Sequence, residues 1–108
     1  MSLSRRYTPE LNPSESCLIG MSYEYIIPPG VGIKSGFVAA LFNQVVSGAV
    51  PSDILTFGPI QIRGRVLYAQ ITATAFTNAF DFQIEWIAYD TQGNVWPRVG
   101  LLLCSPTS

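Results

Sequence analysis

Side chains suited to catalysis are few in this sequence, and histidine is absent from all 108 residues. Histidine is the side chain that most often transfers protons near neutral pH. It is also the usual base in serine–histidine and cysteine–histidine nucleophile pairs. A hydrolase of either type would lack its base here, so the sequence predicts a protein that is not an enzyme.

Paired carboxylates can replace histidine, as in glycoside hydrolysis, where the two groups lie about 5 to 9.5 Å apart. Asp81 and Glu85 share one face of an expected strand, but four residues at about 3.3 Å each separate their backbones by about 13 Å. Glu24 could approach Glu85 across strands, although no motif supports that pairing. Solvated charges on an outer strand face are the simpler interpretation, because alternation already explains both positions.

Ligands for a metal or a cofactor are equally sparse. Cys17 and Cys104 stand near opposite ends of the chain, and without histidine they do not make the usual zinc site. The turn at 90–94 offers two side-chain ligands, whereas calcium prefers six or more oxygens. We expect no metal and no cofactor. Buried free thiols are the favoured interpretation of the cysteines, and a disulfide between the first and last strands stays open.

Positive charge is too scattered to indicate a nucleic-acid partner. Arg5, Arg6, Arg63 and Arg65 could contact phosphates, but the formal net charge is −1 and no basic stripe is present. Ordinary solvation or salt bridges between subunits explain these arginines more simply.

Aromatic residues beside the 90–94 turn support an alternative function, a carbohydrate-binding module or lectin. An aromatic ring can stack on a sugar while nearby polar side chains bind its hydroxyl groups. In this hypothesis the glycan-binding residues are Trp96, Tyr89, Asp90 and Asn94. The competing interpretation is that the aromatic rings pack in an interface between protein chains.

Charge is scarce, at 12% of residues, whereas a typical soluble domain has roughly 25%. A monomer normally keeps a mixed, charged surface, so the deficit predicts that another chain covers part of the surface. Homo-oligomers are the commonest assemblies of soluble proteins, so copies of the same chain are the expected partners.

Strand patterns run through most of the chain after an arm at 1–16 that has two prolines and no periodicity. Residues 17–27 alternate as a strand that the two prolines at 28–29 end. Residues 36–50 are compatible with a strand or a helix, and their β-branched and aromatic residues favour a strand. Two short strands follow, one at 54–57 and one at 60–62, separated by a glycine and a proline.

The second half alternates more clearly. Residues 67–75 predict a half-buried strand, and 80–104 predict a hairpin that turns at 90–94. Pro97 indicates an edge position or a bulge, because proline cannot donate to a central ladder. The expected fold is all-β: an antiparallel β-sandwich or jelly roll of about seven to eight strands, in one domain at 17–108.

These observations favour a non-enzymatic structural protein that associates with copies of itself, as a capsid, decoration or tail component of a virus or phage. Its expected location is the virion, with other virion proteins as further partners. The sequence predicts neither a secretory signal nor a transmembrane segment. Residues 99–104 are apolar on both faces apart from Gly100, so both faces need covering. The expected interface residues are Tyr7, Leu11, Val99, Leu101, Leu102 and Leu103.

Overall fold

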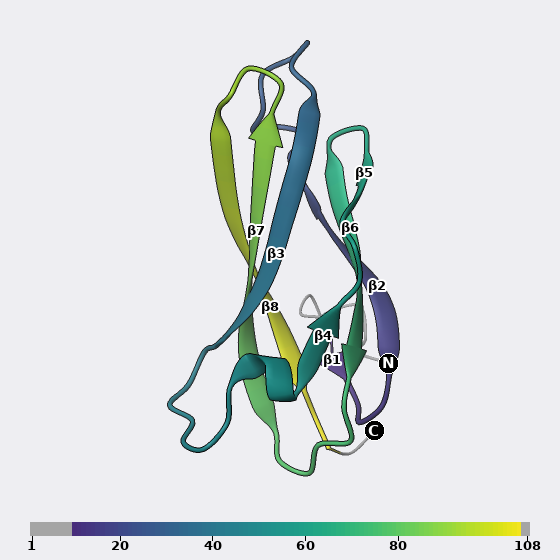
Figure 1. Ribbon diagram of the computed structural model, residues 1–108, viewed down its shortest axis with the longest axis vertical. Coiled ribbons are helices and arrows are strands. Elements are labelled where there is room, and N and C mark those ends of the chain that lie inside the picture. Colours follow the sequence, from purple (N-terminus) through teal and green to yellow (C-terminus); the bar gives the residue numbers. More distant parts are fainter. Residues whose placement is uncertain (1–9, 107–108) are drawn as a thin grey trace, which may run out of the picture.

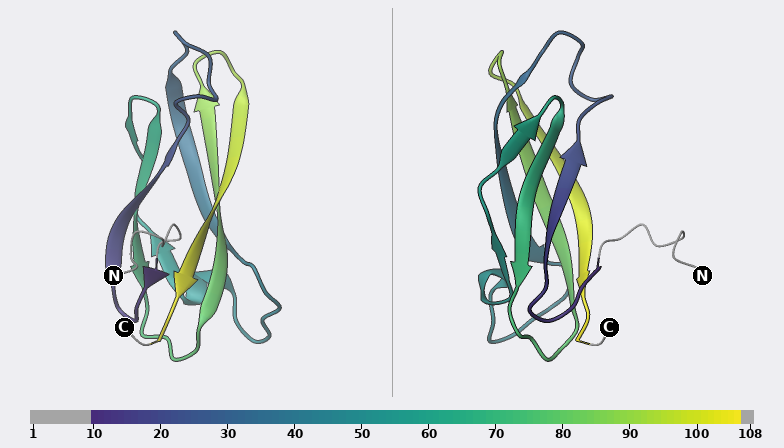
Figure 2. Two further views of the ribbon diagram at one scale, coloured as in Figure 1. Left: turned by 180° about the vertical axis from the view of Figure 1, so that it is seen from behind. Right: turned by 90° about the vertical axis from the view of Figure 1, so that its right-hand side faces the viewer.

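Two sheets pack face to face in the computed structural model, which describes residues 10–106 (Figures 1 and 2). Across sheet A the order is β1 (Glu10–Leu11), β8 (Val95–Cys104), β7 (Phe80–Asp90) and β3 (Ile33–Phe42). In sheet B, β6 (Val66–Ala73) pairs on one side with β2 (Ser16–Ser22) and on the other with β4 (Leu55–Phe57) and β5 (Gln61–Arg63). A short 3₁₀ turn, η2 (Pro51–Asp53), precedes β4. The predicted all-β sandwich of about eight strands is confirmed.

The strand connections distinguish between the two predicted architectures. Sheet B contains β2, β6 and the two short strands β4 and β5, which both pair with β6, while sheet A contains β3, β7 and β8. Seven-stranded immunoglobulin-type sandwiches have the same order, with strands B, E and D in one sheet and C, F and G in the other. The difference lies in β1, which pairs in parallel with the end of β8. The strand order of this sandwich therefore matches that of an immunoglobulin-type sandwich, and strand order alone assigns neither a family nor a function.

Alternation along β6 and β7 builds the core between the sheets. Leu67, Ala69 and Ile71 point inward from β6 and are fully buried, and Phe82 and Trp86 do the same from β7. The residues between them face outward, as a period of two requires. The core therefore uses one face of each strand and leaves the outer face of each sheet to solvent or to a partner.

The strand predicted at 17–27 is shorter in the structure, where β2 ends at Ser22 and a turn begins at Tyr23. The N–H of Tyr23 donates to the carbonyl of Arg65 at 2.8 Å, and the Arg65 guanidinium donates to the carbonyls of Ile27 and Pro28. A distant arginine thus holds this turn, which alternation in the sequence does not reveal. The segment predicted at 36–50 is a strand as favoured, but β3 ends at Phe42.

Part of the predicted arm belongs to the sandwich. Residues 1–9 lie outside the described residues, but β1 pairs with Leu103 and Cys104 at the edge of sheet A.

Pro97 lies in β8 at a position paired with Ile87. Asp90 and Asn94 form a hydrogen-bonded pair, so the even-numbered residues of β8 are the ones that bond to β7. The backbone nitrogen of Pro97, which has no hydrogen to donate, therefore faces away from β7. Within the described part of the chain, no helix is long and apolar enough to cross a membrane.

Candidate interaction surface

The outer face of sheet A collects large apolar side chains that solvent reaches. Their exposed fractions lie between 37% and 54%, far above those of the core. We call the following seven residues the apolar face: Phe37, Leu41, Tyr89, Val95, Val99, Leu101 and Leu103. They come from the three long strands of sheet A, so they form one broad surface on one side of the sandwich. Exposed large apolar side chains gathered on one face of a sheet are typical of an interaction site.

Polar residues interrupt the apolar face along its central strand. Glu85 of β7 lies between Val99 of β8 and Ala39 of β3, and Gln83 lies between Leu101 and Leu41 in the same way. Asp81 continues this row. Within residues 35–41 of β3 and 95–103 of β8, none of the outward-facing residues is a lysine or an arginine. The surface is therefore apolar at its sides and acidic along its centre.

The structure divides the predicted interface residues into three groups. Val99, Leu101 and Leu103 belong to the apolar face, as the sequence suggested. Leu102 is 0% exposed and Leu11 is 2% exposed, so both lie in the core of the same chain and have no side-chain surface left for a partner. The reason is strand alternation in β8, together with the pairing of β1 to its end. Tyr7 lies outside the described residues.

Sequence reasoning missed the β3 side of this surface. Phe37 and Leu41 are about half exposed and lie on the same face of the sheet as Leu101. Alternation in 36–42 shows which residues share a face, but not that β3 lies next to β7. That neighbour relationship depends on pairing between residues that are 40 or more positions apart in the chain.

Of the four predicted glycan-binding residues, Asp90 is hydrogen-bonded to Asn94 and Trp96, whereas Tyr89 lies on the other side of the hairpin. Asp90 is buried, and its carboxylate accepts hydrogen bonds from the backbone N–H groups of Gln92 at 2.8 Å and Asn94 at 2.9 Å. It also accepts from Nδ2 of Asn94 at 3.1 Å and from the indole Nε1 of Trp96 at 2.9 Å. Its four donors are all within the hairpin, so the carboxylate closes the turn between β7 and β8.

The Trp96 hydrogen bond is the main cause that lowers the pKa of Asp90 to about 2, and burial opposes it. Trp96 packs against the core, whereas Tyr89 belongs to the outer face of the sheet. Adjacent register pairs, Ala88 with Trp96 and Tyr89 with Val95, place the two rings on opposite sides of the hairpin. The geometry therefore offers no joint platform for a sugar at this turn.

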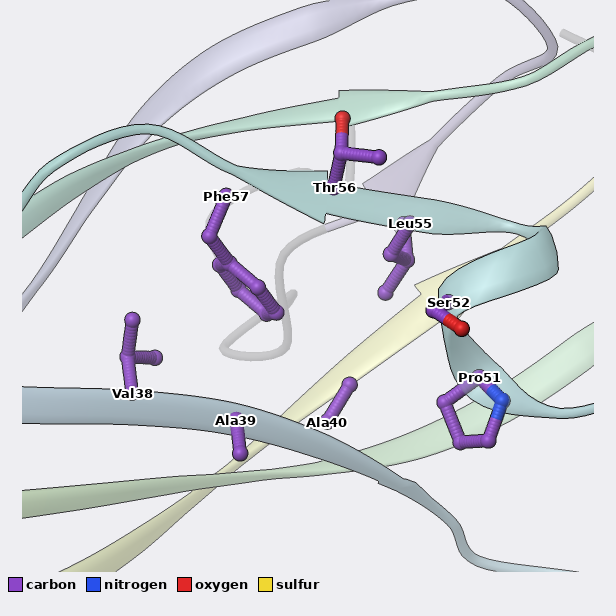
Figure 3. A pocket seen from close by; sticks show the side chains of 8 residues that line it. All are labelled: Val38, Ala39, Ala40, Pro51, Ser52, Leu55, Thr56 and Phe57. Atoms are coloured by element: carbon purple, nitrogen blue, oxygen red, sulfur yellow. The ribbon is translucent and has the colours of Figure 1, made fainter.

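Two cavities of similar size are open to solvent. One of about 370 Å³ lies between β3 and β4 and is lined by no titratable side chain (Figure 3). The other, of about 360 Å³, lies at the end of sheet A, where Glu10, Asp81 and Cys104 contribute to its walls. Neither cavity is lined by Glu24 or Glu85, the other carboxylates considered for catalysis. Among the described residues, no group of three or more Cys, Asp or Glu is placed to hold a metal ion.

The two cysteines are both free thiols. Cys104 is buried beside β1, and burial raises the pKa of its thiol to about 12. Cys17 on β2 is partly buried, and burial followed by the nearby Glu15 raises its pKa as well. A thiol with a raised pKa is a poor nucleophile, because the thiolate is the reactive form.

No protein-family model matches the chain, and no curated protein matches it. The immunoglobulin-type architecture is shared by proteins of many unrelated functions. A function must therefore be inferred from the surfaces of this chain, and above all from the outer face of sheet A.

Proposed function

We propose that this protein is a non-enzymatic structural subunit that associates with copies of itself, and that it serves in a virion as a capsid, decoration or tail component. The observation that carries the proposal is the apolar face of sheet A. A scarcity of charge, at 12% of residues, supports it independently. A second copy of the chain is the partner that every solution of this protein already contains.

The apolar surface on this face is large enough to offset much of the cost of association. Burying the remaining surface of a half-exposed large apolar side chain contributes about 1 kcal/mol, so the seven residues contribute about 7 kcal/mol per copy. If both copies bury the same face, the gain doubles to about 14 kcal/mol. Association costs about 4 to 15 kcal/mol in lost freedom of motion, and desolvation of the polar row on β7 adds to that cost, so the apolar gain is of the same order as the costs.

A pair of matched substitutions tests the role of the apolar face. Leu101 in the face is 47% exposed, and Leu18 on the outer face of sheet B is 49% exposed. Replacing Leu101 by serine removes apolar burial from both copies of a symmetric contact, so we expect the dissociation constant to rise about tenfold or more. Leu18→Ser removes the same side chain from the opposite face and should leave association unchanged.

Sedimentation velocity of the full chain over a wide concentration range measures this. A wild-type chain that stays monomeric at several hundred micromolar would contradict self-association, as would equal effects of the two substitutions. Electron microscopy of the concentrated wild-type protein tests the virion assignment. Rings, tubes or shells support it, whereas isolated dimers without further order contradict it.

A further inference from the structure

The four strand edges of the sandwich differ in how well they resist pairing with another chain. An unpaired edge strand can pair with a strand of another chain unless a proline, a charged side chain, a break in the strand or a covering segment prevents it. The β8 edge is covered at its end by β1 and carries Pro97. At the β2 edge, Arg98 donates to the carbonyl of Ser22 at 2.9 Å. The edge formed by β4 and β5 is broken between the two short strands by Gly58 and Pro59.

Within residues 10–106, none of these features protects the central part of the β3 edge. Its neighbour on one side is β7, and it is the terminal strand of sheet A on the other. Lys34 stands at its beginning, but 35–52 contains no charged residue, and 35–42 contains no proline. Among the described residues, β3 is therefore the longest edge that is free of charge, breaks and covering strands.

The alternation of hydrogen-bonded pairs between β3 and β7 identifies which backbone groups of β3 face away from β7, toward the open edge. The N–H of Asn43 donates to the carbonyl of Asp81 at 2.8 Å, which makes these two residues a hydrogen-bonded pair. Hydrogen-bonded and non-hydrogen-bonded pairs alternate in an antiparallel ladder. The odd-numbered residues from Phe37 to Leu41 therefore bond to β7. The N–H and C=O groups of Val38 and Ala40 point instead to the open edge.

An apolar groove runs beside those free backbone groups. It is the cavity of about 370 Å³ between β3 and β4, and Figure 3 shows Leu55 and Phe57 pointing from β4 toward β3 while Val38 and Ala40 point back toward β4. A strand added next to β3 would hydrogen-bond to its free edge. The inward side chains of that strand would also cover the groove, so backbone pairing and apolar burial would occur together.

We infer that β3 pairs in antiparallel orientation with β3 of a second copy, about a two-fold axis at Ala39, to give one continuous sheet across two subunits. This inference rests on the self-association proposed above and adds a second contact, distinct from the apolar face. The occupant is a second copy because the segment is uncharged, so self-pairing brings no like charges together. An isologous edge contact also satisfies the free groups of both copies at once.

The axis position follows from the extent of the uncharged strand. A centre at Ala39 lets 36–42 pair over its whole length, with the free groups of Val38 opposite those of Ala40 in the partner. On the outer side, Phe37 of each copy then lies opposite Leu41 of the other, and two small alanine side chains meet at the axis. Because Ala39 bonds to β7, the two copies of this residue form a non-hydrogen-bonded pair, in which Cα atoms are about 4.5 Å apart.

Cross-linking tests this register directly in the full chain. Cysteines can be joined when their Cα atoms are about 4.4 to 6.8 Å apart, so Ala39→Cys should form a covalent dimer under mild oxidation. Peptide mass spectrometry should show the link between the two new thiols. The matched control is Thr56→Cys, because Thr56 lies on β4 beside the same groove but points away from it (Figure 3). It should give no such dimer, and neither should the wild-type chain with its two native cysteines.

A proline substitution provides a second readout. Ala40→Pro removes an N–H that makes no bond to β7, so the fold should persist by circular dichroism while association weakens about tenfold. If Ala39→Cys fails to cross-link at concentrations where the wild-type chain is oligomeric, the edge contact is overturned and self-association through the apolar face stands. A monomeric wild-type chain would instead contradict the proposed function itself. If the Ala40→Pro chain does not fold, the cross-linking of Ala39→Cys alone decides whether the β3 edge contact forms.

Discussion

The indole Nε1 of Trp96 donates a 2.9 Å hydrogen bond to the carboxylate of Asp90, linking the second residue of β8 to the last residue of β7. The same carboxylate accepts from the backbone N–H groups of Gln92 and Asn94, which close the turn. A residue that looks like a solvated turn position in the sequence is therefore the buried centre of the hairpin. The carboxylate has to be ionised to accept all of these bonds, so the hairpin is coupled to pH.

Acid should weaken the fold through Asp90. Its pKa is lowered to about 2 in the folded chain, against about 3.9 in an unfolded one. The stabilisation is therefore fully present above about pH 4 and is lost as the pH falls through about 2. Asp90→Asn should be less stable than wild type to urea at pH 7, and the difference should shrink between pH 4 and pH 2.

Trp96→Phe serves as the companion variant for this prediction. It removes the main cause of the lowered pKa but keeps the carboxylate, so the acid transition of the variant should move to higher pH. An NMR titration of the Asp90 carboxyl carbon measures the shift directly. Equal acid sensitivity of wild type and Asp90→Asn would show that Asp90 does not carry the effect.

Tyr23 offers a stabilising substitution. Its side chain is fully buried, and its hydroxyl has no hydrogen-bond partner among the described residues. Burial raises the pKa of this phenol to about 12, and the nearby Arg98 opposes the shift only partly. An unsatisfied buried polar group costs about 1 to 3 kcal/mol. Tyr23→Phe should therefore raise the free energy of unfolding by about 1 kcal/mol in urea denaturation, whereas a loss of that size would reveal a partner for the hydroxyl.

The sequence predicted the fold well where strand alternation is strong and local. The inward and outward residues of β6 and β7 follow directly from their period of two, and the turn at 90–94 follows from its glycine and polar residues. These features depend on neighbours in the chain, which the sequence displays.

Long-range pairing explains what the sequence did not reveal. Leu11 was expected at an interface, but two residues of β1 pair with the end of β8 and bury it. The apolar pattern of 23–27 continues that of β2, but Arg65 holds this segment in a turn. The carbonyl of Arg65 accepts a hydrogen bond from the N–H of Tyr23, and the guanidinium of Arg65 donates to the carbonyl of Ile27. The apolar face itself requires β3 to lie beside β7. Each of these contacts joins residues far apart in the chain, so local periodicity carries no signal for them.

The two cysteines should differ in reactivity. Cys104 is buried with a pKa of about 12, whereas Cys17 is partly buried with a smaller rise. The thiolate is the form that reacts, so iodoacetamide at pH 8 should spare Cys104 in the folded chain and modify Cys17 slowly. Both should react in urea without reductant. Mass spectrometry of the intact chain counts the labels, and failure of both to react in urea would mean that a disulfide joins them.

Salt should strengthen association through the apolar face. Asp81 and Glu85 lie in the centre of that face, so two copies that meet there bring carboxylates of like charge together. Screening shortens the reach of this repulsion from about 10 Å at 0.1 M salt to about 3 Å at 1 M. Salt also leaves apolar burial intact, so the dissociation constant should fall as sodium chloride is raised. Glu85→Gln should bind more tightly at low salt and respond less to added salt.

Glu24→Gln is the matched control, because Glu24 is exposed in the turn after β2 and lies outside sheet A. It removes the same charge from the chain, so any effect of net charge alone would appear in both variants. Sedimentation equilibrium at several salt concentrations separates the two cases. A dissociation constant that rises with salt would mean that ion pairs, rather than apolar side chains, hold the copies together, and the apolar face would then not be the contact.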